Sequence, residues 1–328
     1  MADWLDMGLS WVSGARIARH VPALHLHLHL HLHTPGARMQ DSSALAAELR
    51  RLIVVLEGAL PRPVLAPDFD TGVAFRWRTR AQGGGYLETV RDLSPIGLDD
   101  LMNIERQKAE VTRNTAQFVA GLPANNVLLT GSRGSGKSSL VKALLNEFAP
   151  RGLRVVEVDK HLLGDLPDIV ELLQGRRERF IVYCDDLSFS EDDASYRALK
   201  TTLDGSLHSG AANVVIYATS NRRHLLPETM AENLQARPAE NGELHPGEAL
   251  DDKISLSDRF GIWLTFHPNS QDDYLAAVAL WLGKHGHGLD AATRTAALQW
   301  AQGRGNRSSR TASQFARDWA GRQGLARY

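Results

Sequence analysis

Apolar and polar residues follow a regular order in this chain from about residue 95 onward. Apolar runs of strand length occur at 127–130, 154–158, 180–185, 213–219 and 262–266. Stretches with the period of an amphipathic helix lie before and between them, at 104–120, 137–148, 166–174 and 194–207. Strands that alternate with helices predict an α/β fold in which helices cover both faces of a parallel sheet. Ligands of such a sheet bind at the carboxyl ends of its strands.

The pattern becomes purely helical after the last predicted strand. Residues 271–322 contain Trp281, Trp300 and Trp319 among apolar neighbours. We expect these rings to lie in the core of a helical unit rather than to bind a ligand. The pattern thus predicts an α/β domain at 95–268 and a helical lid at 269–328.

Residues 40–94 predict a small N-terminal module. An amphipathic helix is expected at 42–60, with Ser42 or Ser43 as its N-cap and Gly58 near its end. At 72–90, apolar and aromatic residues flank three consecutive glycines, which is the pattern of a hairpin.

The first 39 residues differ from the rest because histidine alternates with leucine from His25 to His33. A strand would place these imidazoles on one face, as a metal chelator requires. However, no cysteine or carboxylate completes a metal site there, and a strict two-residue repeat is typical of low-complexity sequence. We interpret 1–39 as a dispensable leader, disordered or outside the true coding sequence, with incidental metal binding as the alternative.

Deleting residues 1–38 is therefore expected to leave folding and nucleotide binding intact, because Met39 opens an ordinary globular sequence. Nucleotide affinity and solubility of the truncated protein are the measurements. An insoluble product, or one with lost affinity, would show that the leader belongs to the fold.

Composition narrows the class of protein. The chain has 328 residues, of which 43% are hydrophobic and 23% charged, as in globular proteins. Lys and Arg number 37 against 38 acids, so no global basic field indicates nucleic-acid binding. The one cysteine, Cys184, permits no intrachain disulfide, which fits a reducing compartment. No apolar run approaches the roughly 18 residues of a membrane helix. We expect a soluble, cytoplasmic protein.

A phosphate-binding loop follows the first predicted strand. Residues 131–138 match G-x-x-x-x-G-K-[ST], between the strand NVLLT and the helix SSLVKALLNEF. Glycines let backbone N–H groups surround phosphates, and the helix N-terminus adds partial positive charge. Lys137 is expected to contact the β- and γ-phosphates, and Ser138 to bind Mg²⁺. The predicted ATP-binding residues are Gly131, Ser132, Arg133, Gly134, Ser135, Gly136, Lys137, Ser138 and Ser139.

Polar residues end the strands that follow. The strand at 180–185 runs directly into Asp185 and Asp186, where two adjacent carboxylates are costly unless a cation or water meets them. We expect Asp185 at the Mg²⁺ site and Asp186 to polarise the attacking water. Most ATPases of this kind have Glu at the second position, so the shorter Asp predicts either slow hydrolysis or a differently placed water. The next strand ends at Asn221, which is placed to bridge the γ-phosphate and that water.

Two arginines complete the predicted site. Arg259 lies in the segment LSDRFG before the last strand, where a guanidinium can stabilise charge on the transferred phosphoryl group. Arg310 is expected in the first turn of a lid helix, facing the sheet. Arg307 is the alternative to Arg310.

In this order, the motifs resemble those of an AAA+ ATPase. The segments GLPANNVLLTGSRGSGKSSLVKALLNEFAPRGLRVVEVDK, YCDDLSF, IYATSNRRHLLPE and HPGEALDDKISLSDRFG resemble a bacterial AAA+ family catalogued only as a domain of unknown function. The resemblance covers about 95–322. It implies a five-stranded parallel sheet with a helical lid, ATP between them, and Arg259 acting on the nucleotide of a neighbouring subunit in a ring or open oligomer. The stretch LDDLMNIERQ resembles the adenine-contacting segment, with Asn103 where a glycine is expected.

The resemblance leaves two functions open. The first is an oligomeric ATPase, using ATP and Mg²⁺, that remodels an unidentified macromolecule, protein rather than nucleic acid. The second is an ATP-dependent switch or loader that assembles, recruits a partner and turns over slowly. A small-molecule kinase is disfavoured because kinases need neither the Asp-Arg-Phe-Gly segment nor the lid arginine. The acidic stretch 231–253 is a candidate partner loop.

Overall fold

The computed structural model describes residues 47–52, 67–80, 83–189, 194–204, 211–222, 237–238, 244–245 and 256–325. The chain divides into two units, Met1–Arg62 and Pro63–Tyr328. In the first unit, residues 47–52 are helical, within the helix predicted at 42–60. The His-Leu repeat lies outside the described residues, as does the acidic stretch 231–253 except for four residues. These four form the two-residue strands β7 (Arg237–Pro238) and β8 (Leu244–His245).

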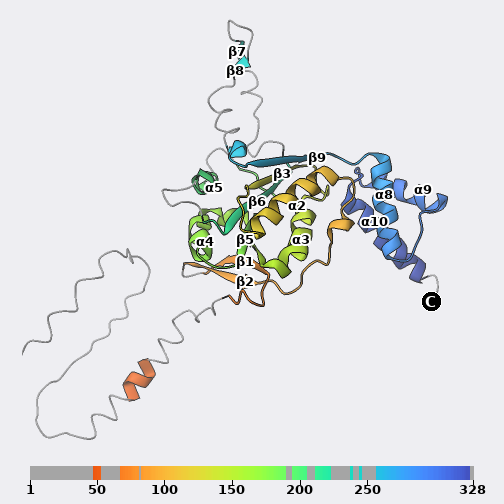
Figure 1. Cartoon of the computed structure of the whole chain (residues 1–328). Helices are drawn as coiled ribbons and strands as arrows, with labels where there is room; N and C mark the ends of the chain where they lie inside the picture. Colours follow the sequence, from red (N-terminus) through yellow and green to blue (C-terminus); the bar gives the residue numbers. More distant parts are fainter. Residues whose placement is uncertain are drawn as a thin grey trace, which may run out of the picture. The chain divides into compact units, whose positions relative to one another are not determined.

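The second unit is built on a seven-stranded sheet (Figure 1). Its strands in chain order are β1 (Ala74–Thr79), β2 (Gly85–Thr89), β3 (Val127–Gly131), β4 (Leu153–Val158), β5 (Arg179–Cys184), β6 (Val214–Ser220) and β9 (Ile262–Phe266). Their order across the sheet is β2-β1-β4-β5-β6-β3-β9. All neighbours are parallel except β1 and β2, which form the predicted hairpin.

The expected strand count of five is therefore wrong, although the α/β fold with a parallel core is confirmed. The five predicted strands form the consecutive block β4-β5-β6-β3-β9. The hairpin, assigned from sequence to the module at 40–94, adds two strands because β1 pairs with β4 from Ala74 opposite Val155 to Arg76 opposite Glu157.

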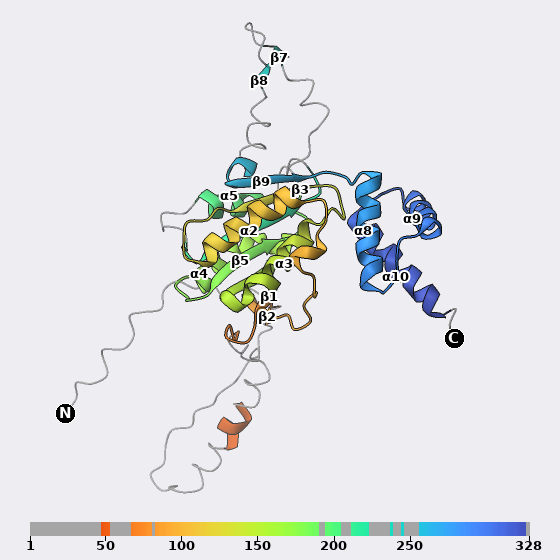
Figure 2. The same cartoon turned by 45° about the vertical axis from the view of Figure 1, so that its right-hand side comes forward.

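Helices cover both faces of the sheet (Figure 2). The helices of the α/β region are α2 (Glu105–Val119), α3 (Lys137–Phe148), α4 (Leu166–Leu173) and α5 (Ala194–Asp204), with short 3-10 helices at Leu98–Asp100 (η1), Ala149–Arg151 (η2) and Lys160–Asp165 (η3). Successive strand residues enter opposite cores. Leu129 packs with α2 and α3, whereas its neighbour Leu128 belongs to the core that contains α4 and α5 residues. This burial on both faces explains why the strands are continuous apolar runs.

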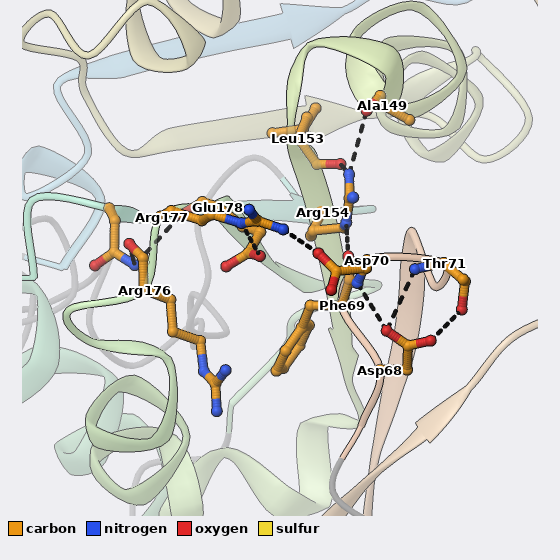
Figure 3. Close-up of polar contacts among 11 residues, drawn as sticks. Asp68, Phe69, Asp70, Thr71, Ala149, Leu153, Arg154, Arg176, Arg177 and Glu178 are labelled. Atoms are coloured by element: carbon orange, nitrogen blue, oxygen red, sulfur yellow. Dashed lines mark hydrogen bonds and ion pairs between the residues drawn. The ribbon is translucent and has the colours of Figure 1, made fainter.

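A buried arginine joins the hairpin to the sheet (Figure 3). Arg154, at the start of β4, donates from Nε to the carbonyl of Phe69 at 2.8 Å and from Nη1 to that of Leu153 at 2.9 Å. The Phe69 ring contacts Phe75 and Phe180 edge-on, at centroid distances of 4.8 and 5.1 Å. Arg154 and Phe69 therefore hold the segment before β1 against β4, which places the hairpin in the main sheet.

The helical region forms a hydrophobic core of its own, separate from the two cores on the faces of the sheet. It contains α8 (Gln271–Lys284), α9 (Ala291–Gly303) and α10 (Ser309–Leu325). Ser270 caps α8 through the backbone N–H of Asp273, and Asp290 caps α9 through that of Thr293. Trp300 and Trp319 pack against Phe315 of α10, as expected for core residues.

Candidate functional site

The glycine-rich loop between β3 and α3 has a backbone that only glycine adopts easily. Gly131, Gly134 and Gly136 have φ angles of 128°, 77° and 104°. A Cβ on Gly131 would lie 2.0 Å from the carbonyl oxygen of Phe266, and one on Gly134 would lie 2.7 Å from the Ser308 hydroxyl. The loop thus packs between β9 and the lid while leading into the N-terminus of α3, where backbone N–H groups favour an anion.

Lys137 lies at the centre of the site and is 5% exposed. Its Nζ donates to the carbonyls of Gly131 at 2.7 Å and Ser132 at 2.8 Å, and to Oδ1 of Asn221 at 3.1 Å. Burial is the largest influence on its pKa and lowers it to about 8, against the opposing charges of Asp185 and Asp186. The two carboxylates therefore offset only part of the cost of burying the ammonium, and a phosphate would offset more of it.

This pKa predicts a pH-dependent nucleotide affinity. Phosphates favour the protonated lysine, so binding should be strongest below pH 8 and weaken as the pH rises through that value. At pH 9 the protonated fraction is about one tenth, and affinity should fall by up to about 10-fold. Calorimetric titration with ATP at pH 7, 8 and 9 measures this fall. The Lys137→Arg variant is the control, because a guanidinium does not titrate in this range, so its affinity should stay level.

Asp185 follows β5 and accepts three hydroxyl hydrogen bonds. Ser138 of α3, Tyr183 of β5 and Thr219 of β6 donate to its Oδ1, at 2.8, 2.6 and 2.5 Å. Burial would raise the pKa of Asp185, but these hydrogen bonds outweigh it and lower the pKa below its usual value. Sequence reasoning missed Tyr183 and Thr219. Strand alternation contained the signal, because each lies two residues before a predicted polar residue, Asp185 or Asn221, on the same face.

Asp186 adopts a left-handed backbone with φ of 54°, which Asp tolerates better than most residues. Its N–H donates to the Thr219 hydroxyl at 2.9 Å, and its Oδ1 accepts from Nδ2 of Asn221 at 2.5 Å. Arg133 of the loop lies 3.7 Å from its Oδ2. The structure thus brings Asp186, Asn221 and Lys137 together at the carboxyl edge of the sheet.

These residues line a pocket of about 730 Å³ that also includes the lid. Arg310 lies in the first turn of α10, lines this pocket, and donates its backbone N–H to the carbonyl of Gly134 at 3.4 Å. Arg307 lines a different pocket, beside Ser132 and Gln302. The geometry therefore favours Arg310 over Arg307 as the lid residue that meets a nucleotide.

Part of the pocket lining is apolar. Ile96, Leu101, Met102 and Ile104 line it from the α/β region, and Ala277 and Trp281 from α8. Trp281 was expected only in the lid core, but its ring packs against that core and also lines the pocket. A flat ring beside aliphatic side chains suits a planar base.

Two side-chain contacts join the lid to the α/β region. Asn103 has a φ of 64°, which explains why asparagine can replace the expected glycine. Its Nδ2 donates to the carbonyl of Asp273 in α8 at 3.0 Å. Lys284 of α8 forms an ion pair with Asp100. The position of α8 over the pocket is thus fixed by side chains from the segment 98–103.

Arg259 is not among the residues that line the pocket. It precedes β9, whose first residue Ile262 pairs with Val127 at the start of β3, whereas Phe266 pairs with Gly131 at the glycine-rich loop. Ile262 and Phe266 are four residue steps apart along the strand, which is roughly 13 Å at about 3.3 Å per residue. Arg259 therefore belongs to the edge opposite its own phosphate-binding loop.

The donor set fits a nucleotide with Mg²⁺. Ser138 and Asp185 supply a hydroxyl and a carboxylate 2.8 Å apart, and hard oxygen ligands are what Mg²⁺ prefers. Within the described residues, no group of three or more His, Cys, Asp or Glu side chains is arranged to bind a metal ion.

Comparison with known proteins gives a match to one family model and matches to several solved structures of low sequence identity. The family model described as "Protein of unknown function (DUF815)" matches residues 70–323. No curated protein matches the chain. Among the helices that the structure describes, none combines the length and apolar character needed to cross a membrane.

Three solved structures that match the chain are distant from it in sequence. A single-residue variant of Thermotoga maritima RuvB matches 68% of this chain and 63% of its own, at 15% identity and a TM-score of 0.46. The FIGL-1 AAA domain in complex with ADP matches 70% of this chain and 74% of its own, at 15% identity and a TM-score of 0.45. Aeropyrum pernix ORC1 in complex with DNA matches 65% and 58%, at 14% identity and 0.45. The chain spans less than two thirds of the RuvB chain's length.

Proposed function

The chain belongs to the family described as "Protein of unknown function (DUF815)", and we propose that it is an AAA+ ATPase that binds ATP with Mg²⁺ and hydrolyses it to ADP and phosphate. One observation carries the proposal. A phosphate-binding loop, two strand-end acids, a strand-end amide and a lid arginine surround a single pocket, although they come from β3, β5, β6 and α10.

Each residue then has a chemical role. Lys137 and the loop N–H groups hold the β- and γ-phosphates, and Ser138 and Asp185 hold Mg²⁺. When bound, Mg²⁺ neutralises charge that develops on the phosphate oxygens. Asp186 polarises the attacking water, which Asn221 orients, and Arg310 contacts the phosphates from the lid. The side chain of Asp186 is one methylene shorter than glutamate, which supports slow turnover.

The direct test is nucleotide binding and phosphate release by the full chain. We expect Mg²⁺-dependent ATP binding by calorimetry, with Asp186→Asn keeping that affinity while losing hydrolysis. An Asp186→Asn variant that hydrolyses ATP like the wild type would contradict the assigned role. Wild-type protein without ATP affinity would contradict the whole proposal.

We place this activity in a homo-oligomer, either a ring or an open assembly, because Arg259 lies at the edge away from its own loop. In this proposal, ATP hydrolysis drives the remodelling of a macromolecular partner in the cytoplasm. We propose a protein partner rather than a nucleic acid because the net charge of the chain is -1. The switch or loader is the second candidate, supported by the aspartate at position 186. Turnover that rises with protein concentration and partner addition favours remodelling, whereas slow turnover with ATP-dependent assembly favours the switch.

A further inference from the structure

Three hydroxyl groups from three different elements meet on one carboxylate oxygen at the edge of the pocket. Tyr183, Thr219 and Ser138 donate to Oδ1 of Asp185 at 2.6, 2.5 and 2.8 Å. Ser138 is the donor expected to bind Mg²⁺ as well. The other two belong to strands, and both are buried, Tyr183 at 4% and Thr219 at 1% exposure.

The two strand donors restrain the carboxylate in a way that Ser138 cannot. Asp185 lies just past the end of β5, where its own side-chain torsions would leave its oxygens free to rotate. Tyr183 holds Oδ1 from within β5, and Thr219 holds it from β6, which pairs with β5. All three hydrogen bonds described here end on Oδ1, so Oδ2 keeps its lone pairs for an ion or its waters.

We infer that Tyr183 and Thr219 are positioning residues that set the Mg²⁺ affinity of this site. The inference rests on the proposed function, since it concerns the same acid. Neither residue is assigned a contact with the ion. Instead, they orient the carboxylate that meets it, and loss of such supporting hydrogen bonds typically costs about 10–100-fold in metal affinity or activity.

A purely structural role for Tyr183 is the competing explanation, and the chain contains a matched control. Tyr217 lies directly opposite Tyr183 in the β5–β6 register and is 0% exposed. Its hydroxyl interacts with Asn114 at 3.0 Å and Thr115 at 2.9 Å, on α2. A Tyr→Phe substitution at either position removes one buried hydroxyl from one of two neighbouring strands. Only the substitution at position 183 removes a hydrogen bond to Asp185.

The experiment is a titration of a fluorescent ATP analogue against the full chain, first in EDTA and then across Mg²⁺ concentrations. For Tyr183→Phe we expect metal-free affinity within about two-fold of wild type and a Mg²⁺ midpoint raised about 10-fold or more. Tyr217→Phe should leave both values unchanged. Thr219→Val should raise the midpoint in the same direction as Tyr183→Phe.

The possible results distinguish failure of the positioning role from failure of the proposed function. A wild-type Mg²⁺ midpoint in Tyr183→Phe, or an affinity that falls equally with and without Mg²⁺, overturns the positioning role while leaving the proposed function intact. If the nucleotide affinity of the wild-type protein does not change with the Mg²⁺ concentration, the proposed function itself is overturned. If Tyr183→Phe does not fold, Thr219→Val decides by the same criteria.

Discussion

Lys137→Ala is expected to remove nucleotide binding almost completely. The ammonium is a cation at the centre of the pocket, and a charge-assisted hydrogen bond contributes about 1.5–3 kcal/mol. Loss of two such bonds to phosphates predicts an affinity lower by about 10²–10⁴-fold. The fold should survive, because burial already disfavours the charged form of this lysine and lowers its pKa to about 8.

Calorimetry with ATP and Mg²⁺ measures this loss, and Lys142→Ala is the matched control. Lys142 lies in the same helix, α3, but is exposed and does not line the pocket. We expect Lys142→Ala to bind ATP like the wild type. Near-normal affinity in Lys137→Ala would exclude the glycine-rich loop as the phosphate site.

Arg259→Ala is expected to keep ATP binding and lose hydrolysis. The residue precedes β9, at the edge opposite the glycine-rich loop, so we expect it to serve the site of a neighbouring chain rather than its own. A guanidinium supplied in trans is worth about 10³–10⁵ in rate where it has been measured in GTPases. Even a slow aspartate-based site should therefore lose most of its turnover.

Mixing two inactive variants tests the in-trans role directly. A mixed oligomer of Arg259→Ala and Lys137→Ala contains some interfaces with an intact Lys137 on one side and an intact Arg259 on the other. Turnover of the 1:1 mixture should exceed that of either variant alone, above the assembly concentration. An inactive mixture in which mixed oligomers demonstrably form argues against action in trans. Wild-type turnover by Arg259→Ala alone would make the arginine a structural residue.

Local sequence patterns were sufficient to predict five strands and four helices of the α/β region. The five predicted strands and four predicted helices occur near their expected positions, because hydrophobic periodicity and helix signals act over a few neighbouring residues. The glycine-rich loop was equally predictable, since its phosphate-binding groups are contiguous in the chain. Grouping Asp185, Asp186 and Asn221 followed from a general rule that parallel strands end at one edge.

Contacts between segments that are far apart in the sequence could not be predicted from local patterns. The hairpin joined the sheet because Arg154 and Phe69 hold it against β4, and no local pattern encodes that contact. The position of Trp281 at the pocket could not be predicted. Helix periodicity identifies an apolar position but not its distance from a neighbouring domain. The hydroxyl of Thr219 meets Asp185 because β5 pairs with β6 in one register. Strand pairing is a non-local interaction, so register and the contacts that depend on it are fixed only when the whole sheet assembles.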